Sequence, residues 1–405
     1  MQEQVQTDYS AEYSDNLPAL LKQLNIALVF TSYQAGRLML VRTDGSQLDI
    51  NYKSFPRPMG LAVTKNSLTL GVFTQVLKFQ REDALLEQIK QPLLPIDQDI
   101  TAPRLKTGFK ANPVKEEADD LVELTAEQEK LLQEQQRWLD YQQQLMDPVD
   151  ERTDACFITR SAHYSGMINI HDIEWGSEGL WAVNSSFSCL CTLSPEASFV
   201  PRWKPYFITE LMPEDRCHLN GMALKDGKPV YVTTFSKFNE PAMWRKGDKF
   251  DGTLMDVEQN KILLDNLCMP HSPRYYRNKV YYCNSGEGQI CCYDPKTGQN
   301  DILAEVPGFT RGMAFYGPFL IVGLSKVRQS DVTSPAPLAN RYSDTCSGIW
   351  LFHLDSGKTI ATLKFTGNVD QIYDVAVLAG CSFPELIEPG HPRMRNHFCF
   401  PALAE

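Results

Sequence analysis

The sequence predicts an all-β protein: a single six-bladed β-propeller that is closed by its own N-terminal strands and carries a helical insertion. Three observations lead to this prediction. Six short segments of similar pattern align without gaps along the 405 residues. Strand-like runs bounded by turn residues follow most of these segments. The later repeats start at residues 170, 219, 270, 310 and 372, a spacing of about 40 to 60 residues that suits four-stranded blades with loop insertions.

Each repeated segment is expected to form the innermost strand of one blade. It starts with a variable residue that is polar or bulky. A small residue usually follows, and apolar residues then occupy alternating positions. The six segments are PMGLAV, IHDIEW, LNGMAL, PHSPRY, TRGMAF and IYDVAV. After the first five comes a second β-rich run, namely SLTLGVF, GLWAVNS, KPVYVTTF, NKVYYCN and GPFLIVGL. Further strand-like runs such as CLCTLSP, QICCYDPKTG and GIWLFHLDSG follow, with turn residues at their ends.

The two ends of the chain are expected to complete one blade together. The sixth repeat, around Tyr373, has too little chain behind it to form a blade alone. Three strand-like runs precede the first repeat: IALVFTSY, GRLMLVRTDG and QLDINYKSF. One strand from the C-terminal end and three from the N-terminal end make a full blade, and such closure removes exposed sheet edges. The propeller is therefore assigned to residues 26–80 and 154–385.

Three segments lie outside the repeat. Residues 1–25 are expected to form an N-terminal arm with a short helix near Asn16–Leu24, whose first turn tolerates Pro18. Residues 81–153 form an insertion rich in Glu and Gln. Residues 386–405 form a C-terminal tail with several prolines, which we expect to be disordered or loosely docked.

The insertion is expected to be helical. Thr125 and Gln128 form a capping box. Apolar residues recur every seven positions at Leu124, Leu131, Trp138 and Leu145. The alternate heptad positions are glutamines, which are polar for a two-helix seam. A single helix lying on the propeller is therefore favoured over a coiled coil, and the insertion is a candidate arm for a protein partner or for self-association.

Composition excludes several classes of partner. The net charge of −11 and the pI near 5.2 argue against broad nucleic-acid binding, which needs a basic surface. No window approaches the roughly 20 apolar residues of a membrane span. The start of the sequence, MQEQVQTDYS, lacks the basic and apolar regions of a secretory signal. Eleven cysteines without a CxxC pair fit reduced thiols, so we expect a cytoplasmic protein that binds neither nucleic acid nor membrane.

Polar residues gather at one end of the predicted propeller. Loops that precede innermost strands and loops that join second to third strands share this end. The aligned column just inside the innermost strands consists of Met59, His171, Asn220, His271, Arg311 and Tyr373. Two residues upstream lie Arg57, Asn169, His218, Met269, Phe309 and Gln371. The second-to-third-strand loops add Tyr33, Gln34, Asn184, Ser185, Asn284, Ser285, Lys326 and Arg328.

The three histidines at this end predict a divalent metal site. Neutral imidazoles and an Asn carbonyl are suitable ligands, so His171, His218, His271 and Asn220 are the candidates. Asp172 and Asp374 are candidate catalytic bases, or residues that orient a histidine. The alternative is structural: the histidines hydrogen-bond neighbouring loops and join the blades.

The cationic residues at the same end predict an anionic ligand. The candidate substrate-binding residues are Arg57, Arg274, Arg311, Lys326, Arg328, Tyr33 and Gln34. Arginine forks suit a carboxylate or a phosphate, so the ligand is a small anionic molecule or a peptide. The alternative pairs these cations with Asp172, Asp215, Asp370 and Asp374 in structural salt bridges.

The stretch LNGMALKDGKPVYVTTFS resembles the inner-blade motif of the senescence-marker-protein and gluconolactonase propellers. That resemblance covers one blade and implies that Asn220 supplies a divalent-metal ligand. The chain departs from this family where His171 and His271 stand at the positions that correspond to acidic ligands. A second resemblance covers nearly the full chain and rests on six strings, namely TSYQAGRL, RPMGLAV, EDRCHLNGMA, MPHSPR, GFTRGMAF and GLSKVR. These strings resemble an uncharacterised bacterial family known by a domain-of-unknown-function label, which implies a soluble propeller without an assigned reaction.

Two functions follow from these residues. The first is a metal-dependent enzyme that acts on a small polar or anionic molecule or a peptide. Its chemistry would be hydrolysis or elimination by an activated water, or oxygen chemistry if the metal is iron or copper. The second is a binding propeller that recruits a protein partner through its rim loops and the insertion. Fold alone does not choose between them.

Overall fold

The computed structural model describes residues 8–93, 145–327, 336–395 and 397–401, with six helical residues between 126 and 140. It divides into two compact units. The first comprises residues 1–81 and 160–384, and the second comprises residues 82–159 and 385–405. Each unit is described by itself below.

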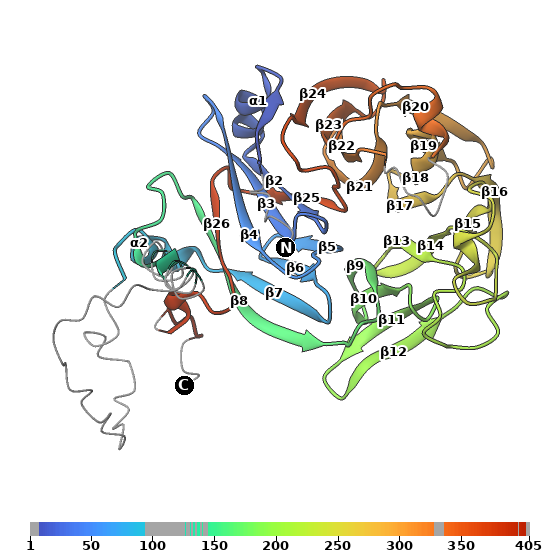
Figure 1. The fold of residues 1–405 in the computed structure, drawn as a ribbon, viewed down its shortest axis with the longest axis horizontal. Helices are drawn as coiled ribbons and strands as arrows, with labels where there is room; N and C mark the ends of the chain where they lie inside the picture. Colours follow the sequence, from blue (N-terminus) through green and yellow to red (C-terminus); the bar gives the residue numbers. More distant parts are fainter. Residues whose placement is uncertain are drawn as a thin grey trace. The chain divides into compact units, whose positions relative to one another are not determined.

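Six antiparallel sheets make up the propeller of the first unit, and Figure 1 shows them around a common centre. Blade 1 contains β5 (Leu61–Thr64), β6 (Ser67–Gly71), β7 (Gln75–Arg81) and β8 (Ala155–Tyr164). Blade 2 contains β9 (Ile170–Gly176), β10 (Gly179–Asn184), β11 (Cys189–Ser194) and β12 (Ala197–Trp203). Blade 3 contains β13 (Leu219–Lys225), β14 (Lys228–Thr234), β15 (Gly252–Asp256) and β16 (Lys261–Leu267).

The remaining blades follow the same order from the centre outward. Blade 4 contains β17 (Pro270–Tyr276), β18 (Lys279–Asn284), β19 (Gln289–Tyr293) and β20 (Asn300–Glu305). Blade 5 contains β21 (Phe309–Tyr316), β22 (Phe319–Ser325), β23 (Gly348–His353) and β24 (Lys358–Phe365). The six repeated segments of the sequence thus supply the six innermost strands, which confirms the predicted fold class.

Blade 6 joins the two ends of the chain. Its innermost strand is β25 (Val375–Ala379), which is followed outward by β2 (Ile26–Ser32), β3 (Arg37–Thr43) and β4 (Leu48–Ser54). The pairing runs from Ile26 opposite Ala379 to Phe30 opposite Val375. The predicted closure is therefore confirmed, and both faces of β2 are buried.

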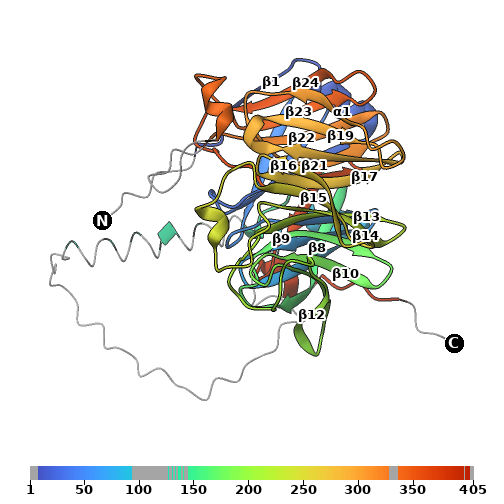
Figure 2. The same cartoon turned by 90° about the vertical axis from the view of Figure 1, so that its right-hand side faces the viewer.

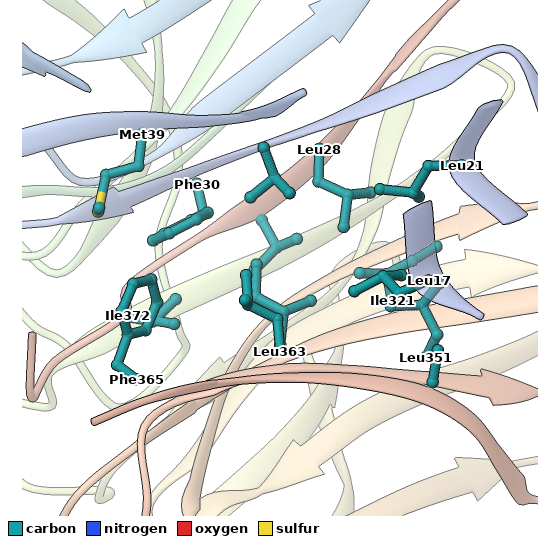
Figure 3. Close-up of a cluster of buried hydrophobic side chains, with 14 of the residues drawn as sticks. Leu17, Leu21, Leu28, Phe30, Met39, Ile321, Leu351, Leu363, Phe365 and Ile372 are labelled. Atoms are coloured by element: carbon teal, nitrogen blue, oxygen red, sulfur yellow. The ribbon is translucent and has the colours of Figure 1, made fainter. Parts of the chain in front are cut away.

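The N-terminal arm adds two elements to the propeller. The strand β1 (Ala11–Tyr13) pairs with β24 as a fifth strand of blade 5, an element that the sequence did not predict (Figure 2). The helix α1 (Leu17–Leu24) has Pro18 in its first turn and ends at Asn25, which has a left-handed backbone. Figure 3 shows Leu17 and Leu21 of this helix beside side chains of β2, β22, β23 and β24. The arm thereby extends the core between blades 5 and 6.

The second unit has its own small core. It contains the 3₁₀ turn η1 (Asp83–Leu85), the helix α2 (Leu86–Ile89), the first half of β8, β26 (Pro384–Ile387) and the 3₁₀ turn η5 (Pro392–Arg395). The core side chains are Leu85, Ile89, Cys156, Ile158 and Ile387. The strand β26 lies beside β8, where Thr159 Oγ1 donates a hydrogen bond to the carbonyl of Ile387.

The C-terminal tail is not loosely docked around η5, which corrects the expectation for this segment. The Arg393 side chain is 1% exposed, and its guanidinium donates to the carbonyls of Gln88, Gln91 and Asp147. A buried cation with three acceptors fixes the segment within the second unit. Of the predicted insertion helix, Ala126, Lys130, Gln133 and Leu145 are helical, whereas Thr125 and most heptad positions lie outside the described residues.

Ten of the eleven cysteines are buried. Burial raises the pKa of Cys217 and of Cys283 to about 12, so these thiols stay protonated as core residues. No helix among the described residues is long and apolar enough to span a bilayer.

Candidate functional site

A small cavity lies between the innermost strands at the end predicted from the sequence. Its volume is about 10 Å³, room for about one water molecule. It is lined by His171, Asp172, Asn220, His271, Ser272, Arg274, Tyr373 and Asp374. Five of these eight residues belong to the candidate metal and catalytic sets, so the aligned column does bring them together. We call the surrounding region, with His171, His218 and His271, the histidine end.

The backbone at this end repeats an unusual conformation. Arg57, Asn169, His218 and Met269 occupy the column two residues upstream of the aligned one, and each has a positive φ between 49° and 55°. L-residues adopt this left-handed region rarely, and such residues cluster at functional sites. The conformation turns the chain sharply into the innermost strand, which places the next side chains over the cavity.

His171 has a defined tautomer. Its Nδ1 lies 2.8 Å from the carbonyl oxygen of Asn169 and 2.7 Å from Ser185 Oγ. The single hydroxyl proton of Ser185 goes to the carbonyl of Leu219 in blade 3. Both neighbours therefore act as acceptors for the ring, so Nδ1 carries the proton and Nε2 keeps a lone pair.

His271 repeats the same arrangement in blade 4. Its Nδ1 lies 3.0 Å from the carbonyl oxygen of Met269 and 2.9 Å from Ser285 Oγ. Ser285 in turn donates to the carbonyl of Thr310 in blade 5 over 2.6 Å. Each serine thus joins two blades and fixes a histidine. The contacts at Nδ1 are those of the structural interpretation, in which the histidines hydrogen-bond neighbouring loops and join the blades.

The electrostatics keep both rings neutral. Burial is the main cause that lowers the pKa of His171 to about 3, and the neighbouring His218 is the next largest. Burial is also the main cause that holds the pKa of His271 well below its ordinary value, and the charge of Arg311 is the next largest. Among the described residues, no group hydrogen-bonds Nε2 of either ring.

His218 has different partners. Its Nδ1 lies 2.9 Å from a carboxylate oxygen of Asp215, and its ring stacks on Trp244 with centroids 4.0 Å apart. Trp244 Nε1 donates to the same carboxylate over 3.1 Å. Although burial opposes it, His218 lowers the pKa of Asp215, which therefore stays ionised. The edge of the His171 ring faces His218 at 4.7 Å between centroids.

Asp172 and Asp374 hold Arg274 in the middle of the channel. Arg274 donates to both oxygens of Asp172, over 2.7 and 3.1 Å, and one of its nitrogens lies 3.6 Å from Asp374. The carboxylates also accept backbone N–H groups of neighbouring blades: Met222 donates to Asp172 and Leu61 donates to Asp374. These two candidate bases are thus engaged in a buried ion network that connects blades.

Burial raises the pKa of Asp374 to about 7, against the pull of Arg274. Burial opposes the charged form of Arg274, but the charge of Asp172 outweighs this effect and raises the pKa of the guanidinium. Asn220 also has protein partners, because its Oδ1 accepts a hydrogen bond from Thr233 over 2.9 Å. No three or more His, Cys, Asp or Glu side chains of the described part of the chain are grouped so that they could hold a metal ion.

Arg311 differs from the other cations at this end. Its guanidinium donates one hydrogen bond, to Tyr33 Oη over 3.3 Å, and its buried Nε has no acceptor. It lies over the rings of Tyr33, Phe309 and Tyr373 at 6.0, 4.9 and 5.5 Å. Among the described residues it forms no ion pair, and burial lowers its pKa.

Tyr373 is a second group without a partner. It is 6% exposed, and its hydroxyl oxygen has no hydrogen bond within the described structure. Tyr373 lines the cavity and lies edge-on to His171. An unpaired cation, an unpaired hydroxyl and two bare imidazole nitrogens therefore meet at one place.

The other predicted binding residues that the structure describes have partners of different kinds. Arg57 donates to Asn169 Oδ1 over 2.8 Å, Lys326 pairs with Asp370, and Tyr33 donates to Gln371. Gln34 accepts a long hydrogen bond from the backbone of Asp370. Arg328 lies outside the described residues. The salt-bridge alternative thus accounts for Arg274 and Lys326, but not for Arg311.

The sequence interpretation missed a larger pocket at the other end of the same strands. Its volume is about 390 Å³. Its lining residues include Glu174, Trp175, Met222, Leu224, Arg274, Tyr275, Met313, Phe315, Val375 and Val377. The signal was present, because Glu174 stands beside Trp175 in the repeat IHDIEW. The aligned columns that predicted the site cover only the loops at the histidine end, and Glu174 lies further along its strand.

Comparisons with known proteins give a family but no activity. The family model described as a domain of unknown function, DUF4915, matches residues 15–99 and 115–387. No curated protein matches the chain. A solved chain from the crystal structure of a nidogen/laminin complex is 10% identical, with a TM-score of 0.48 over 88% of this chain and 99% of that chain. TolB from Acinetobacter baumannii is 11% identical, with a TM-score of 0.42 over 89% of this chain and 66% of that chain.

Proposed function

This chain belongs to the DUF4915 family, and from its own geometry we propose that it binds a small molecule with a carboxylate or phosphate group at the histidine end. Arg311 supplies the positive charge for the anion. Tyr33 and Tyr373 flank the guanidinium, and the Tyr373 hydroxyl is free to donate.

The unpaired state of Arg311 carries this proposal. Burial of a cation that has no carboxylate partner and too few hydrogen-bond acceptors costs free energy. A protein rarely retains such a cation unless the cation has a function. The carboxylates of Asp172 and Asp374 are both directed to Arg274, and no carboxylate of the described residues pairs with Arg311. The neutral state of His171 and His271 supports the proposal, since it limits competing positive charge and leaves Arg311 as the anion's partner.

A thermal-shift titration tests the proposal, with inorganic phosphate and acetate as probes and chloride at equal ionic strength as the reference. A ligand that binds only the folded protein raises the melting temperature with its concentration. We expect this rise in the wild type, a loss in Arg311→Met and partial retention in Arg311→Lys. Arg202→Met, which changes an exposed arginine on β12, is the matched control. Equal shifts in wild type and Arg311→Met would refute the proposal.

A metal-dependent reaction at the same end is the second candidate. The observation that favours it is the shared tautomer: Nδ1 of His171 and His271 donates to fixed acceptors, and Asp215 holds Nδ1 of His218. Acceptors at Nδ1 orient an imidazole so that Nε2 can bind a metal. Among the described residues these histidines are not grouped as a metal site, so a divalent ion that activates a water for hydrolysis or elimination would have to draw them together.

Elemental analysis of the purified protein tests the metal directly. Stoichiometric metal that is lost in the His171→Ala and His271→Ala variants, while the fold is kept, would support catalysis. Protein without stoichiometric metal after reconstitution with zinc, manganese, calcium or iron would leave anion binding alone. Recruitment of a protein partner through residues 81–153 stays a prediction, because most of that segment lies outside the described residues.

A further inference from the structure

The pocket at the other end of the innermost strands has the size and lining of a ligand site. We call it the glutamate pocket, after Glu174, which lies three residues beyond His171 on β9. Its volume of about 390 Å³ falls within the range of small-molecule sites, about 300 to 1,000 Å³. Arg274 lines both this pocket and the cavity at the histidine end. The ion network of Arg274 therefore lies between the two sites.

Most residues that line the glutamate pocket have apolar side chains. They come from the innermost strands of blades 1, 3, 5 and 6, and three aromatic residues complete the lining: Trp175, Tyr275 and Phe315. Two of the rings already have cations of the chain near them, Lys78 over Trp175 and Lys225 over Tyr275. Neither lysine is among the residues that line the pocket. The wall thus offers contact area for an apolar, ring-sized body.

The charge inside the pocket is negative. Glu174 is the one carboxylate among the lining residues, and Arg274 is the one cation. Arg274 pairs with Asp172 and Asp374, and its charge also acts on Glu174 against the effect of burial. Among the described residues, Glu174 accepts one hydrogen bond, from the backbone N–H of Trp175 over 3.2 Å. Its carboxylate therefore has acceptor capacity left for a ligand.

We propose that the glutamate pocket binds a small amine, with the ammonium group on Glu174 and an apolar body against Trp175, Tyr275 and Phe315. An ammonium can donate to the carboxylate, and a hydrogen bond between two charged groups is stronger than one between neutral groups. Burial raises the pKa of Glu174 to about 7, and a bound cation would favour the ionised form of its carboxyl group. This inference concerns a different ligand and a different end from the proposed function.

Isothermal titration calorimetry with three probes of one shape tests this proposal: 2-phenylethylamine, 2-phenylethanol and 3-phenylpropionate. At pH 8 we expect the amine to bind, and the alcohol and the carboxylate to bind at least about tenfold more weakly. Glu174→Gln should weaken the amine about tenfold to a hundredfold. The matched control is Glu178→Gln, the same charge change at an exposed position of the β9–β10 turn. It should leave the affinity unchanged.

A second variant keeps the test decisive if Glu174→Gln fails to fold. Leu224→Trp leaves Glu174 in place but fills the pocket, so the amine should no longer bind. Equal affinity for the amine and the carboxylate, or amine binding that survives both variants, would overturn the proposal. Arg311→Met should leave amine binding intact, and Glu174→Gln should leave the phosphate shift intact. The failure of one site is thus distinguishable from the failure of the other.

Discussion

Ser185 and Ser285 show how single residues combine structure with chemistry at the histidine end. Each donates its hydroxyl proton to a carbonyl of the next blade and accepts the Nδ1 proton of a histidine. The same bond that joins two blades therefore fixes the tautomer of the ring. Thr31 and Ser325 join their blades in a similar way, to the carbonyls of Met59 and Ile372, but hold no histidine.

The neutral state of His271 predicts a pH dependence of stability. The unfolded chain takes up a proton at this residue near pH 6.5, whereas the folded protein does not until well below that value. The contribution of His271 is thus fully present above pH 6.5 and is lost as the pH falls. His271→Gln should reduce the slope of the unfolding free energy by about 1.4 kcal/mol per pH unit between pH 6 and 5.

Denaturant unfolding of wild type and His271→Gln at several pH values measures this slope. Asp374 and Glu174 have raised pKa values, so the folded state holds their protons between about pH 4.5 and 7 and their contribution to stability falls as the pH rises. Both carboxyl groups are present in the two proteins, and the comparison isolates the histidine. Parallel pH profiles for the two proteins would show that His271 is protonated in the folded state.

At the scale of elements, the innermost strands were predictable because their pattern recurs. A small residue followed by apolar residues at alternating positions can be recognised in the sequence of each innermost strand. The strand β1 was not predictable, because Ala11–Tyr13 carries little apolar signal and pairs with β24, which is distant in the sequence. The tail was misjudged for a similar reason. The burial of Arg393 depends on three carbonyl groups that lie about 250 to 300 residues away.

The pairing of the arginines was also beyond the sequence. Arg274 and Arg311 both stand inside innermost strands of the repeat. Only the packing of the blades brings Asp172 to Arg274 and leaves Arg311 among rings. The aligned columns located the site, but the partner of each side chain required the three-dimensional structure.

Arg393 should control the stability of the second unit. Arg393→Met would leave the carbonyls of Gln88, Gln91 and Asp147 without their donor in a buried place. We expect a loss of about 2 to 4 kcal/mol in that unit. Hydrogen exchange of α2 and the first half of β8 should become faster, with Arg152→Met as an exposed control. Unchanged exchange in Arg393→Met would contradict this role.

At the scale of the whole propeller, one ion network separates two unlike sites. The histidine end holds a guanidinium without an ion pair among the described residues, and the glutamate pocket holds the carboxyl group of Glu174. Asp172, Arg274 and Asp374 lie between them and connect four blades through backbone hydrogen bonds. The same network therefore stabilises the ring of blades and keeps the two sites distinct.

Removal of Arg274 should destabilise the propeller strongly. Arg274→Met leaves two carboxylates buried together, at an expected cost of about 3 to 5 kcal/mol near pH 8. The loss should be smaller near pH 5, where Asp374, whose pKa is raised by burial, takes up a proton. The triple variant Asp172→Asn, Arg274→Met, Asp374→Asn should recover much of the stability. Denaturant unfolding at both pH values tests this, and a cost that is independent of pH would contradict it.

The central claim is that Arg311 is held unpaired for an anionic ligand, and the most direct measurement compares Arg311→Met with the wild type with and without phosphate. Without phosphate, we expect the variant to be at least as stable as the wild type, because it removes a cation that has no carboxylate partner. With phosphate, only the wild type should gain stability as the concentration rises. A variant that is several kcal/mol less stable in the absence of ligand, or that gains as much as the wild type from phosphate, would contradict the claim.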